Sequence, residues 1–189
     1  SLKEFTTGMD TRSIDWKQTS RHAKLIGKEY RTERNHHVVL AIDSGRLMCA
    51  PLGDAPRVDR AINAALLLAF VSLKMGDRVR LFAFDAKPRI ASGSTAGAQA
   101  FPLLQRLAAS IDYTMEETNF TLGLTTLAGG LDRRALVVVF TDFADPTSAE
   151  MMIENVGRLI RAHLVMFVTF RDEALEALAD QEPASPEDV

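Results

Sequence analysis

The sequence predicts an α/β fold with a doubly wound, mostly parallel central sheet and helices on both of its faces. Short, continuous apolar runs such as Val38–Ile42 are typical of strands buried on both faces. These runs alternate with segments whose apolar residues recur every three or four positions, as in a helix. Such alternation requires crossover connections, which place the strands parallel and the helices on either side of them.

The expected strands of this sheet are the apolar runs between turn residues. They are Val38–Ile42, Val79–Phe84, Ala135–Phe140 and Leu164–Phe170, with Arg89-Ile90 as a short hairpin partner. Helical periodicity predicts the elements between them, which are Val58–Met75, Ala98–Ile111, Thr121–Leu131, Ser148–Ala162 and a helix over Asp172–Ala179. We expect Ser148 or Thr147 to cap the fourth helix, and the segment 112–119 to be a loop.

We expect one folded unit of three parts. Residues 1–37 are polar and form an extended N-terminal arm with short elements, residues 38–180 form the α/β domain, and residues 181–189 form a flexible tail. The chain begins with Ser1 rather than Met, so we expect it to be a piece of a longer protein, in which any membrane anchor lies in segments outside these residues.

The composition is that of a globular protein, with 47% apolar and 25% charged residues. No apolar run reaches the roughly 18 residues of a membrane span. The formal net charge of −3 argues against a nucleic-acid partner. Cys49 is the single cysteine, which favours a reducing compartment, and we expect this domain to be cytoplasmic.

Two aspartates follow strands that we expect to be neighbours. Asp43 follows the first strand directly, and Asp142 lies just beyond the strand Ala135–Phe140. Ligands of such sheets bind beyond the carboxyl ends of the strands, where the strand order reverses. Two carboxylates there would hold a hard cation such as Mg²⁺, or each would cap a following turn, and position alone does not decide between these alternatives.

The residues around Asp43 resemble the metal-ion-dependent adhesion site of von Willebrand factor A domains. That site has D-x-S-x-S after the first strand, a Thr on a second loop and an Asp on a third. Asp43 matches the first Asp, Thr118 matches the Thr through its T-x-x-x-x-G spacing to Gly123, and Asp142 matches the third-loop Asp. Gly45 and Leu47 replace both serines. The resemblance therefore implies a degenerate site, with Asp43, Thr118 and Asp142 as candidate Mg²⁺ ligands.

The arm carries a second, longer resemblance. The segment 8–17 reads G-M-D-T-R-S-I-D-W-K and resembles the G-x-D-x-R-x-I-D-W signature of the bacterial family called domain of unknown function 58. The T-S-R at 19–21 stands where that family has S-A-R, and the K-E-Y of 28–30 with Glu33 fits its K-E-[FY]-x-x-E segment. The K-E-F of 3–5 resembles its opening R-E-Y, and the order of elements then agrees with that family from residue 3 to about 178, nearly the whole chain.

The resemblance to this family also implies a function. Such proteins carry a von Willebrand factor A-like domain and are commonly encoded beside MoxR-type AAA+ ATPases. The resemblance implies a non-enzymatic adaptor or chaperone-like partner of such an ATPase, binding through Asp43, Ser44, Thr118 and Asp142, with or without a bridging Mg²⁺.

Two alternatives stay open. Arg12, Asp15 and Trp16 form either a folded arm, with an Asp–Arg pair and Trp16 packed on the domain, or a surface for a partner. The alternative function is a Mg²⁺-dependent phosphate-ester hydrolase that uses Asp43. Gly45 stands where such enzymes need a second Asp, and no nucleophile with an adjacent base is recognisable, which favours the non-enzymatic function.

Overall fold

The computed structural model describes residues 2–4, 14–22, 24–28, 35–143, 152, 156–157 and 159–172. The chain divides into two compact units, residues 1–34 and residues 35–189. The expected division of the chain into arm, domain and tail stays a prediction.

The first unit contains a short antiparallel pair and a helix. Strand β1 (Leu2–Glu4) pairs with β2 (Ile26–Lys28), and helix α1 (Trp16–His22) lies between them in the sequence. Asp15 caps this helix, because its Oδ1 accepts a hydrogen bond from the amide of Lys17 at 3.1 Å. Trp16 is 68% exposed. Most of the family signature, including Arg12, lies outside the described residues.

The second unit has the predicted α/β fold. Its main sheet has the order β10-β9-β3-β6-β7, and β8 pairs with the first two residues of β6. The four strands β10 (Leu164–Val168), β9 (Leu136–Phe140), β3 (His37–Asp43) and β6 (Arg78–Phe84) run parallel. The hairpin strands β7 (Pro88–Ala91) and β8 (Thr95–Ala96) are antiparallel to β6. The expected strands and the Arg89-Ile90 hairpin are therefore confirmed.

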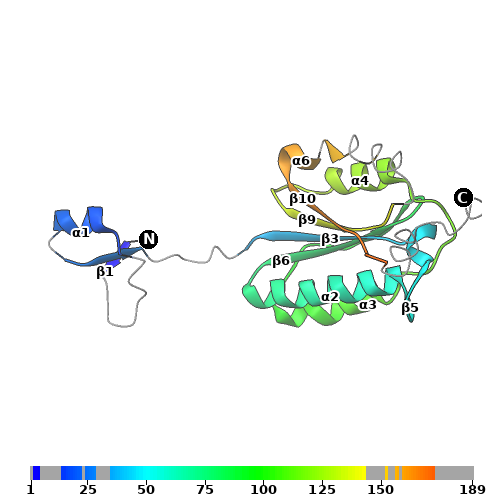
Figure 1. Cartoon of the computed structure of the whole chain (residues 1–189), viewed down its shortest axis with the longest axis horizontal. Helices are drawn as coiled ribbons and strands as arrows, with labels where there is room; N and C mark the ends of the chain where they lie inside the picture. The colour runs from blue at the N-terminus through cyan, green and yellow to red at the C-terminus, as the bar shows by residue number, and fades with distance from the viewer. Residues whose placement is uncertain are drawn as a thin grey trace, which may run out of the picture. The chain divides into compact units, whose positions relative to one another are not determined.

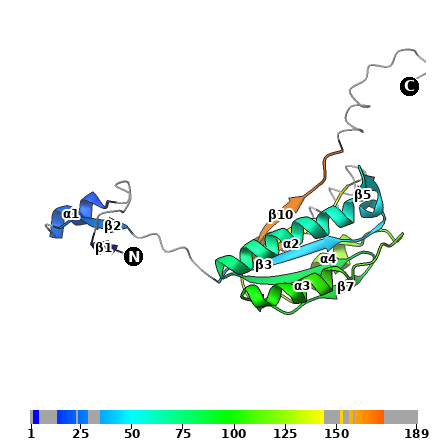
Figure 2. The same cartoon turned by 90° about the horizontal axis from the view of Figure 1, so that it is seen from below.

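Helices cover both faces of the sheet, as Figure 1 shows. Helices α2 (Arg57–Met75) and α3 (Phe101–Ala108) lie on one face, and α4 (Phe120–Gly129) and α6 (Leu159–Ala162) lie on the other. Figure 2 shows α2 and α3 side by side along the first of these faces. Two two-residue strands, β4 (Pro51–Leu52) and β5 (Ala55–Pro56), and the short 3-10 helix η2 (Arg46–Cys49) connect β3 to α2.

Helix α3 is shorter than the segment Ala98–Ile111 predicted for it. Residues Ala98–Ala100 form a separate 3-10 turn, and Pro102 stands in the first turn of the α-helix, where a missing N–H costs nothing. The helix Ser148–Ala162 is described only in part, over α6 and the helical residues Met152 and Val156. Its predicted caps, Thr147 and Ser148, and all but the first residue of the predicted helix 172–179 lie outside the described residues.

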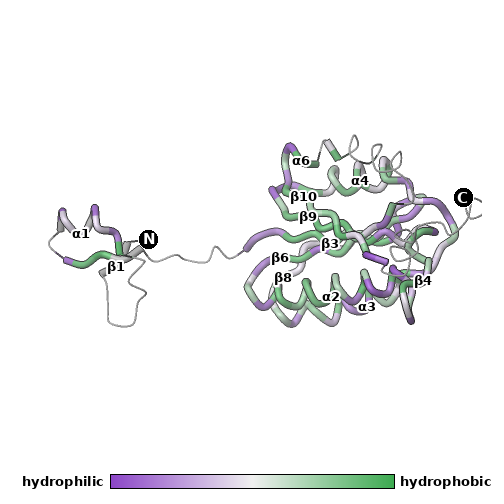
Figure 3. Tube along the Cα trace, in the orientation of Figure 1, coloured by the Kyte–Doolittle hydropathy of each residue, from purple (hydrophilic) through white to green (hydrophobic). Residues whose placement is uncertain are grey.

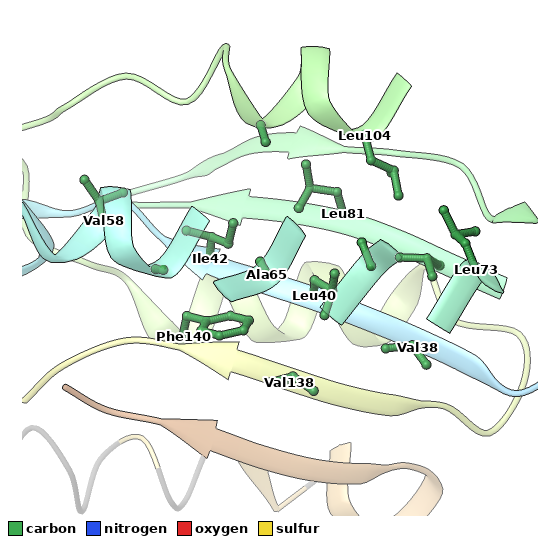
Figure 4. Packing of buried hydrophobic residues seen from close by; sticks show 14 of the residues in the cluster. Val38, Leu40, Ile42, Val58, Ala65, Leu73, Leu81, Leu104, Val138 and Phe140 are labelled. Carbon is green, nitrogen blue, oxygen red and sulfur yellow. The ribbon is translucent and has the colours of Figure 1, made fainter. Parts of the chain in front are cut away.

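Two apolar clusters sandwich the sheet. The cluster under α2 and α3 includes Leu40, Ile42 and Leu104, and Figure 4 shows their side chains meeting between the helices and the strands. The second cluster packs Val39, Phe84 and Leu124 under α4. The central strands are coloured hydrophobic along most of their length in Figure 3. In the described part of the chain, no helix is long and apolar enough to cross a membrane.

The strand order reverses at β3. The chain passes from β3 to β6 on one side and later places β9 on the other side of β3. The carboxyl ends of β3 and β9 therefore form the crevice where ligands of such folds bind. We call this end of the sheet the carboxyl edge, and the opposite end the amino edge.

Candidate functional site at the carboxyl edge

Asp43 is the last residue of β3, and its carboxylate lies inside the protein with 1% of the residue exposed. Its Oδ1 accepts hydrogen bonds from the amide of Gly45 at 2.8 Å and from Oγ1 of Thr118 at 2.6 Å. Its Oδ2 accepts a third from Oγ1 of Thr141 at 2.7 Å. Both carboxylate oxygens are therefore engaged by donors from three separate segments.

The pKa of Asp43 is raised above its usual value, chiefly because burial penalises the charged form. The hydrogen bonds from Thr118, Thr141 and Gly45 oppose this effect, and the nearby carboxylate of Asp85 adds to it. A buried carboxylate at this position is therefore held by its donors at some electrostatic cost.

Thr141 is the residue at this site that the sequence interpretation missed. The register pairs Ile42 of β3 with Phe140 of β9, so the next residues, Asp43 and Thr141, lie side by side. The sequence analysis named the following residue, Asp142, instead. Side chains alternate along a strand, so neighbouring residues point in opposite directions, and this alternation could have identified Thr141 from the sequence.

Asp142 is held by the chain's own arginine. Its Oδ2 lies 3.2 Å from Nε of Arg57, the first residue of α2, and its Oδ1 accepts a hydrogen bond from the amide of Phe143. Nη2 of Arg57 also contacts Oδ2 of Asp172 at 3.1 Å, just beyond β10. The Arg57 side chain is 11% exposed, and its Nε has no aligned hydrogen bond within the described structure, so the Asp142 contact is a pairing of charges.

The glycine in the D-x-S-x-S position is explained by Thr118. A Cβ atom on Gly45 would lie 2.1 Å from Oγ1 of Thr118 and 3.2 Å from Oδ1 of Asp43. A serine at position 45 is therefore incompatible with the direct hydrogen bond from Thr118 to Asp43. The loss of the first serine and the direct Thr–Asp contact belong together.

The candidate ligands do not fit a metal ion in this arrangement. The Thr118 hydroxyl donates directly to Oδ1 of Asp43 at 2.6 Å, so in this arrangement these two groups are engaged by each other rather than by a cation. Asp142 is already neutralised by Arg57. Within the described residues, no group of three or more His, Cys, Asp or Glu side chains is arranged to hold a metal. The residues predicted to bind Mg²⁺ form a hydrogen-bonded cluster and a separate ion pair.

Ser44 is also buried rather than displayed. Its amide and hydroxyl both donate to the carbonyl of Phe84, at 2.9 and 3.3 Å, and its own carbonyl accepts from Oγ1 of Thr114 at 3.0 Å. Of the four predicted partner-binding residues, Asp43 and Ser44 are buried, and Thr118 and Asp142 are partly exposed. The first two can support a binding surface but do not reach it.

A third acid anchors the next strand end. Asp85 follows β6, is fully buried, and accepts hydrogen bonds from Nε of Arg89 at 2.6 Å and the amide of Lys87 at 3.1 Å. Burial raises its pKa, but the hydrogen bonds and the Arg89 charge outweigh burial and leave the pKa lowered. The carbonyl of Asp85 accepts from the amide of Asn119, which caps α4.

The exposed surface of this edge comes from the predicted loop 112–119 before α4, of which sequence reasoning singled out only Thr118. Met115 is 79% exposed and Tyr113 is 61% exposed. Around them, Arg46 pairs with Glu117 at 3.0 Å, and Glu116 pairs with Arg89 at 3.2 Å. We call these residues the carboxyl-edge surface: Arg46, Tyr113, Met115, Glu116 and Glu117.

This loop is fixed to η2, α2 and the end of β3. The amide of Arg46 donates to the carbonyl of Glu116 at 2.9 Å, and Sγ of Cys49 donates to the carbonyl of Thr114 at 3.2 Å. The Tyr113 hydroxyl donates to the Asp59 carboxylate on α2, with distances of 2.8 and 3.0 Å to its two oxygens. Thr118 then ties the end of the loop to Asp43.

The model of the family described as protein of unknown function DUF58 matches residues 1–188. The chain belongs to this family. No curated protein matches the sequence. The family assignment made from the arm signature is therefore confirmed, although most of that signature lies outside the described residues.

Several solved structures are similar to the chain. A conserved hypothetical protein BatB from Bacteroides thetaiotaomicron has 13% identity and a TM-score of 0.49, over 77% of this chain and 96% of that one. An aerotolerance-related membrane protein from Bacteroides fragilis has 14% identity and a TM-score of 0.45, over 77% and 97%. The VWA domain of SpRpn10 has 12% identity and a TM-score of 0.44, over 80% and 96%. At such low identities these similarities say nothing about function.

Proposed function

We propose that this DUF58 domain is a non-enzymatic protein-interaction module that binds a MoxR-type AAA+ ATPase through its carboxyl-edge surface. The observation that carries the proposal is the exposure of Met115 and Tyr113 on one loop, whose Glu116 and Glu117 form ion pairs with Arg89 and Arg46 and whose end is tied to Asp43 by Thr118. Apolar and aromatic anchors inside a polar rim are typical of protein-binding surfaces.

The buried cluster around Asp43 supports this surface rather than contacting the partner. Its three hydrogen bonds join β3, the loop at Thr118 and the end of β9, so the surface is held in shape before binding. A preorganised surface loses less conformational entropy on association. The partner then binds through direct contacts, without a bridging cation.

The choice of partner is supported by family membership. The match covers nearly the whole chain, and the resemblance described above implies genetic proximity to MoxR-type ATPases. The single cysteine, Cys49, fits a reducing compartment, and we place this domain in the cytoplasm. The hydrolase alternative has less support, because Asp43 is buried with both oxygens accepting hydrogen bonds and offers no free nucleophile.

The test is co-purification of this domain with the MoxR-type ATPase proposed as its partner, in the presence of a non-hydrolysable ATP analogue. Met115→Asp replaces the exposed apolar side chain of the carboxyl-edge surface by a charge and is expected to weaken binding at least about tenfold, as for an interface anchor. Met75→Asp is the matched control, because Met75 is 54% exposed at the opposite end of α2. Equal binding by both variants would overturn the assignment of the surface, and no binding by the wild type would overturn the partner.

A further inference from the structure

Basic side chains gather at the amino edge, far from Asp43 along the same strands. His37 and Arg78 are the first residues of β3 and β6 and are cross-strand partners. Arg80 stands two residues further along β6, so it lies on the same face as Arg78, the face covered by α4. Arg133 lies just before β9, the strand that pairs with β3.

These residues surround a small cavity. Its volume is about 100 Å³, and its charged and polar lining consists of His37, Arg78, Arg80, Ser94, Asp132 and Arg133. Three arginines thus face one carboxylate, so the lining carries an excess of positive charge even with His37 neutral. Such an excess around a concave site attracts anions.

Arg80 has an unmet hydrogen-bonding group at this site. One of its terminal nitrogens, Nη1, donates to the carbonyl of Gly130. Its Nε is buried and has no hydrogen-bond partner among the described residues. A buried donor without an acceptor is costly, and native proteins rarely keep one without a functional reason. Nε itself lies too deep for a ligand to contact, but it marks Arg80 as a charge that the described part of the fold leaves incompletely satisfied.

A second cavity opens beside the first and shares Arg80 and Val39 with it. Its volume is about 370 Å³, a size typical of small-molecule sites. Its walls are mostly apolar and come largely from β6 and α4, including Phe82 and Leu127, and its lining also contains the hydroxyl residues Ser92 and Thr126. Arg80 is its one charged lining residue. The two cavities together present a cationic part and an apolar part.

We propose that the two cavities form one binding site for a small amphiphilic anion. Its phosphate or carboxylate group lies beside Arg78, Arg80 and Arg133, and its apolar part enters the larger cavity between β6 and α4. The site is independent of the proposed ATPase interaction, because it lies at the other end of the sheet and shares no residue with the carboxyl-edge surface.

His37 provides a spectroscopic probe of this site. Burial lowers the pKa of its imidazole, and the charges of Arg133, Arg78 and Arg80 lower it further. An anion beside these arginines would offset their charge. Binding is therefore expected to raise the pKa of His37, which a proton–carbon NMR titration of the ring measures.

The experiment is calorimetric titration of the protein with hexyl phosphate, hexanoate, inorganic phosphate and hexanol. We expect one of the two amphiphilic anions to bind, more tightly than inorganic phosphate and than hexanol, and the stronger of the two identifies the head group. Arg133→Gln, in an exposed loop, is expected to weaken binding about tenfold, as for the loss of one charge-assisted hydrogen bond. Arg80→Gln is expected to weaken it at least as much.

The matched control is Arg106→Gln, which removes the same charge from an exposed position of α3 on the opposite face of the sheet. Binding that is unchanged by Arg133→Gln and Arg80→Gln would overturn the proposed location. Hexyl phosphate and hexanoate that both bind no more tightly than inorganic phosphate would overturn the amphiphilic ligand. Absence of heat with every anion, together with an unchanged His37 pKa, would overturn the site.

Discussion

Charged side chains at the two ends of the central sheet differ in how they are paired. At the carboxyl edge, each buried acid has partners from the chain itself: Asp43 has Gly45, Thr118 and Thr141, and Asp85 has Arg89. At the amino edge, three arginines line a cavity with one aspartate. A buried Nε without a hydrogen bond occurs at both ends of the described structure, but Arg57 is paired with Asp142 and Asp172, whereas Arg80 forms no ion pair with a described residue.

This difference suggests that charged residues at the carboxyl edge stabilise the fold, whereas those at the amino edge bind a ligand. A charge that is paired inside the fold stabilises a shape, whereas a desolvated charge without an opposite charge gains from an external ligand. The carboxyl edge therefore offers a partner its surface loop, while the amino edge offers a ligand three arginines that line a cavity with a single carboxylate. Substitutions at the two ends should accordingly differ in what they change.

The largest expected effect is the loss of the Asp43 carboxylate. Asp43→Ala leaves the hydroxyls of Thr118 and Thr141 and the amide of Gly45 without their acceptor, and we expect unfolding free energy to fall by about 3 kcal/mol. Urea denaturation measures this change. Asp43→Asn keeps the shape and most of the acceptor capacity, so its loss should be clearly smaller. Equal losses for the two variants would show that the hydrogen bonds are not what stabilises this edge.

The ion pairs of Arg57 come next. Arg57→Gln leaves Asp142 and Asp172 without their cation, and we expect a loss of about 2 kcal/mol, below the value for a fully buried pair because both acids are about one-fifth exposed. Adding Asp142→Asn should restore part of the stability. Strictly additive losses in this double-mutant cycle would argue that Arg57 stabilises the fold through packing alone.

The pH dependence of stability should report the burial of Asp43. Its pKa is raised in the folded protein, so the folded state binds the proton more tightly than the unfolded state does. The corresponding stability is present below the usual pKa of 3.8 and is lost as pH rises through the folded pKa, by up to about 1.4 kcal/mol per pH unit. Unfolding free energies compared with Asp43→Asn across this range isolate the effect, and a difference that grows in the opposite direction contradicts it.

Restoring the serine of the D-x-S-x-S pattern should be harmful. Gly45→Ser brings a Cβ atom against Oγ1 of Thr118, and we expect a loss of about 1 kcal/mol in thermal or urea unfolding. Gly93→Ser is the control, because a Cβ atom there meets nothing within 4 Å. A stabilising Gly45→Ser would mean that the cluster opens readily toward a metal-binding arrangement.

The smallest effect is expected at the amino edge. Arg133→Gln should change the unfolding free energy by less than about 0.5 kcal/mol, because Arg133 is exposed and lies among like charges. The same substitution is the one expected to weaken anion binding, so stability and binding separate at this end of the sheet. A large loss of stability would place Arg133 in the folding core instead.

The sequence predicted the fold well because the fold depends on patterns along the chain. Apolar runs such as Ala135–Phe140 and the three-to-four spacing within Val58–Met75 survive as β9 and α2 with bounds shifted by a residue. The candidate site was predicted less well. Asp43 and Thr118 do meet, but the contribution of Thr141 depends on the register between β3 and β9.

The remaining site residues depend on contacts that no local pattern encodes. Arg57 reaches Asp142 and Asp172 across more than eighty residues of sequence, and the cavity at Arg80 collects side chains from three strand starts. The exposure of Met115 likewise follows from how its loop crosses the strand ends. Long-range pairing of this kind becomes visible only in the folded arrangement.

Calorimetric titration of Mg²⁺ and Mn²⁺ into the protein tests most directly whether the carboxyl edge is closed by its own hydrogen bonds. Because Thr118 contacts Asp43 directly and Arg57 neutralises Asp142, we predict no heat beyond dilution for either ion at millimolar concentration. Heat with the wild type that disappears in Asp43→Asn would contradict this account and would establish a metal site at the end of β3.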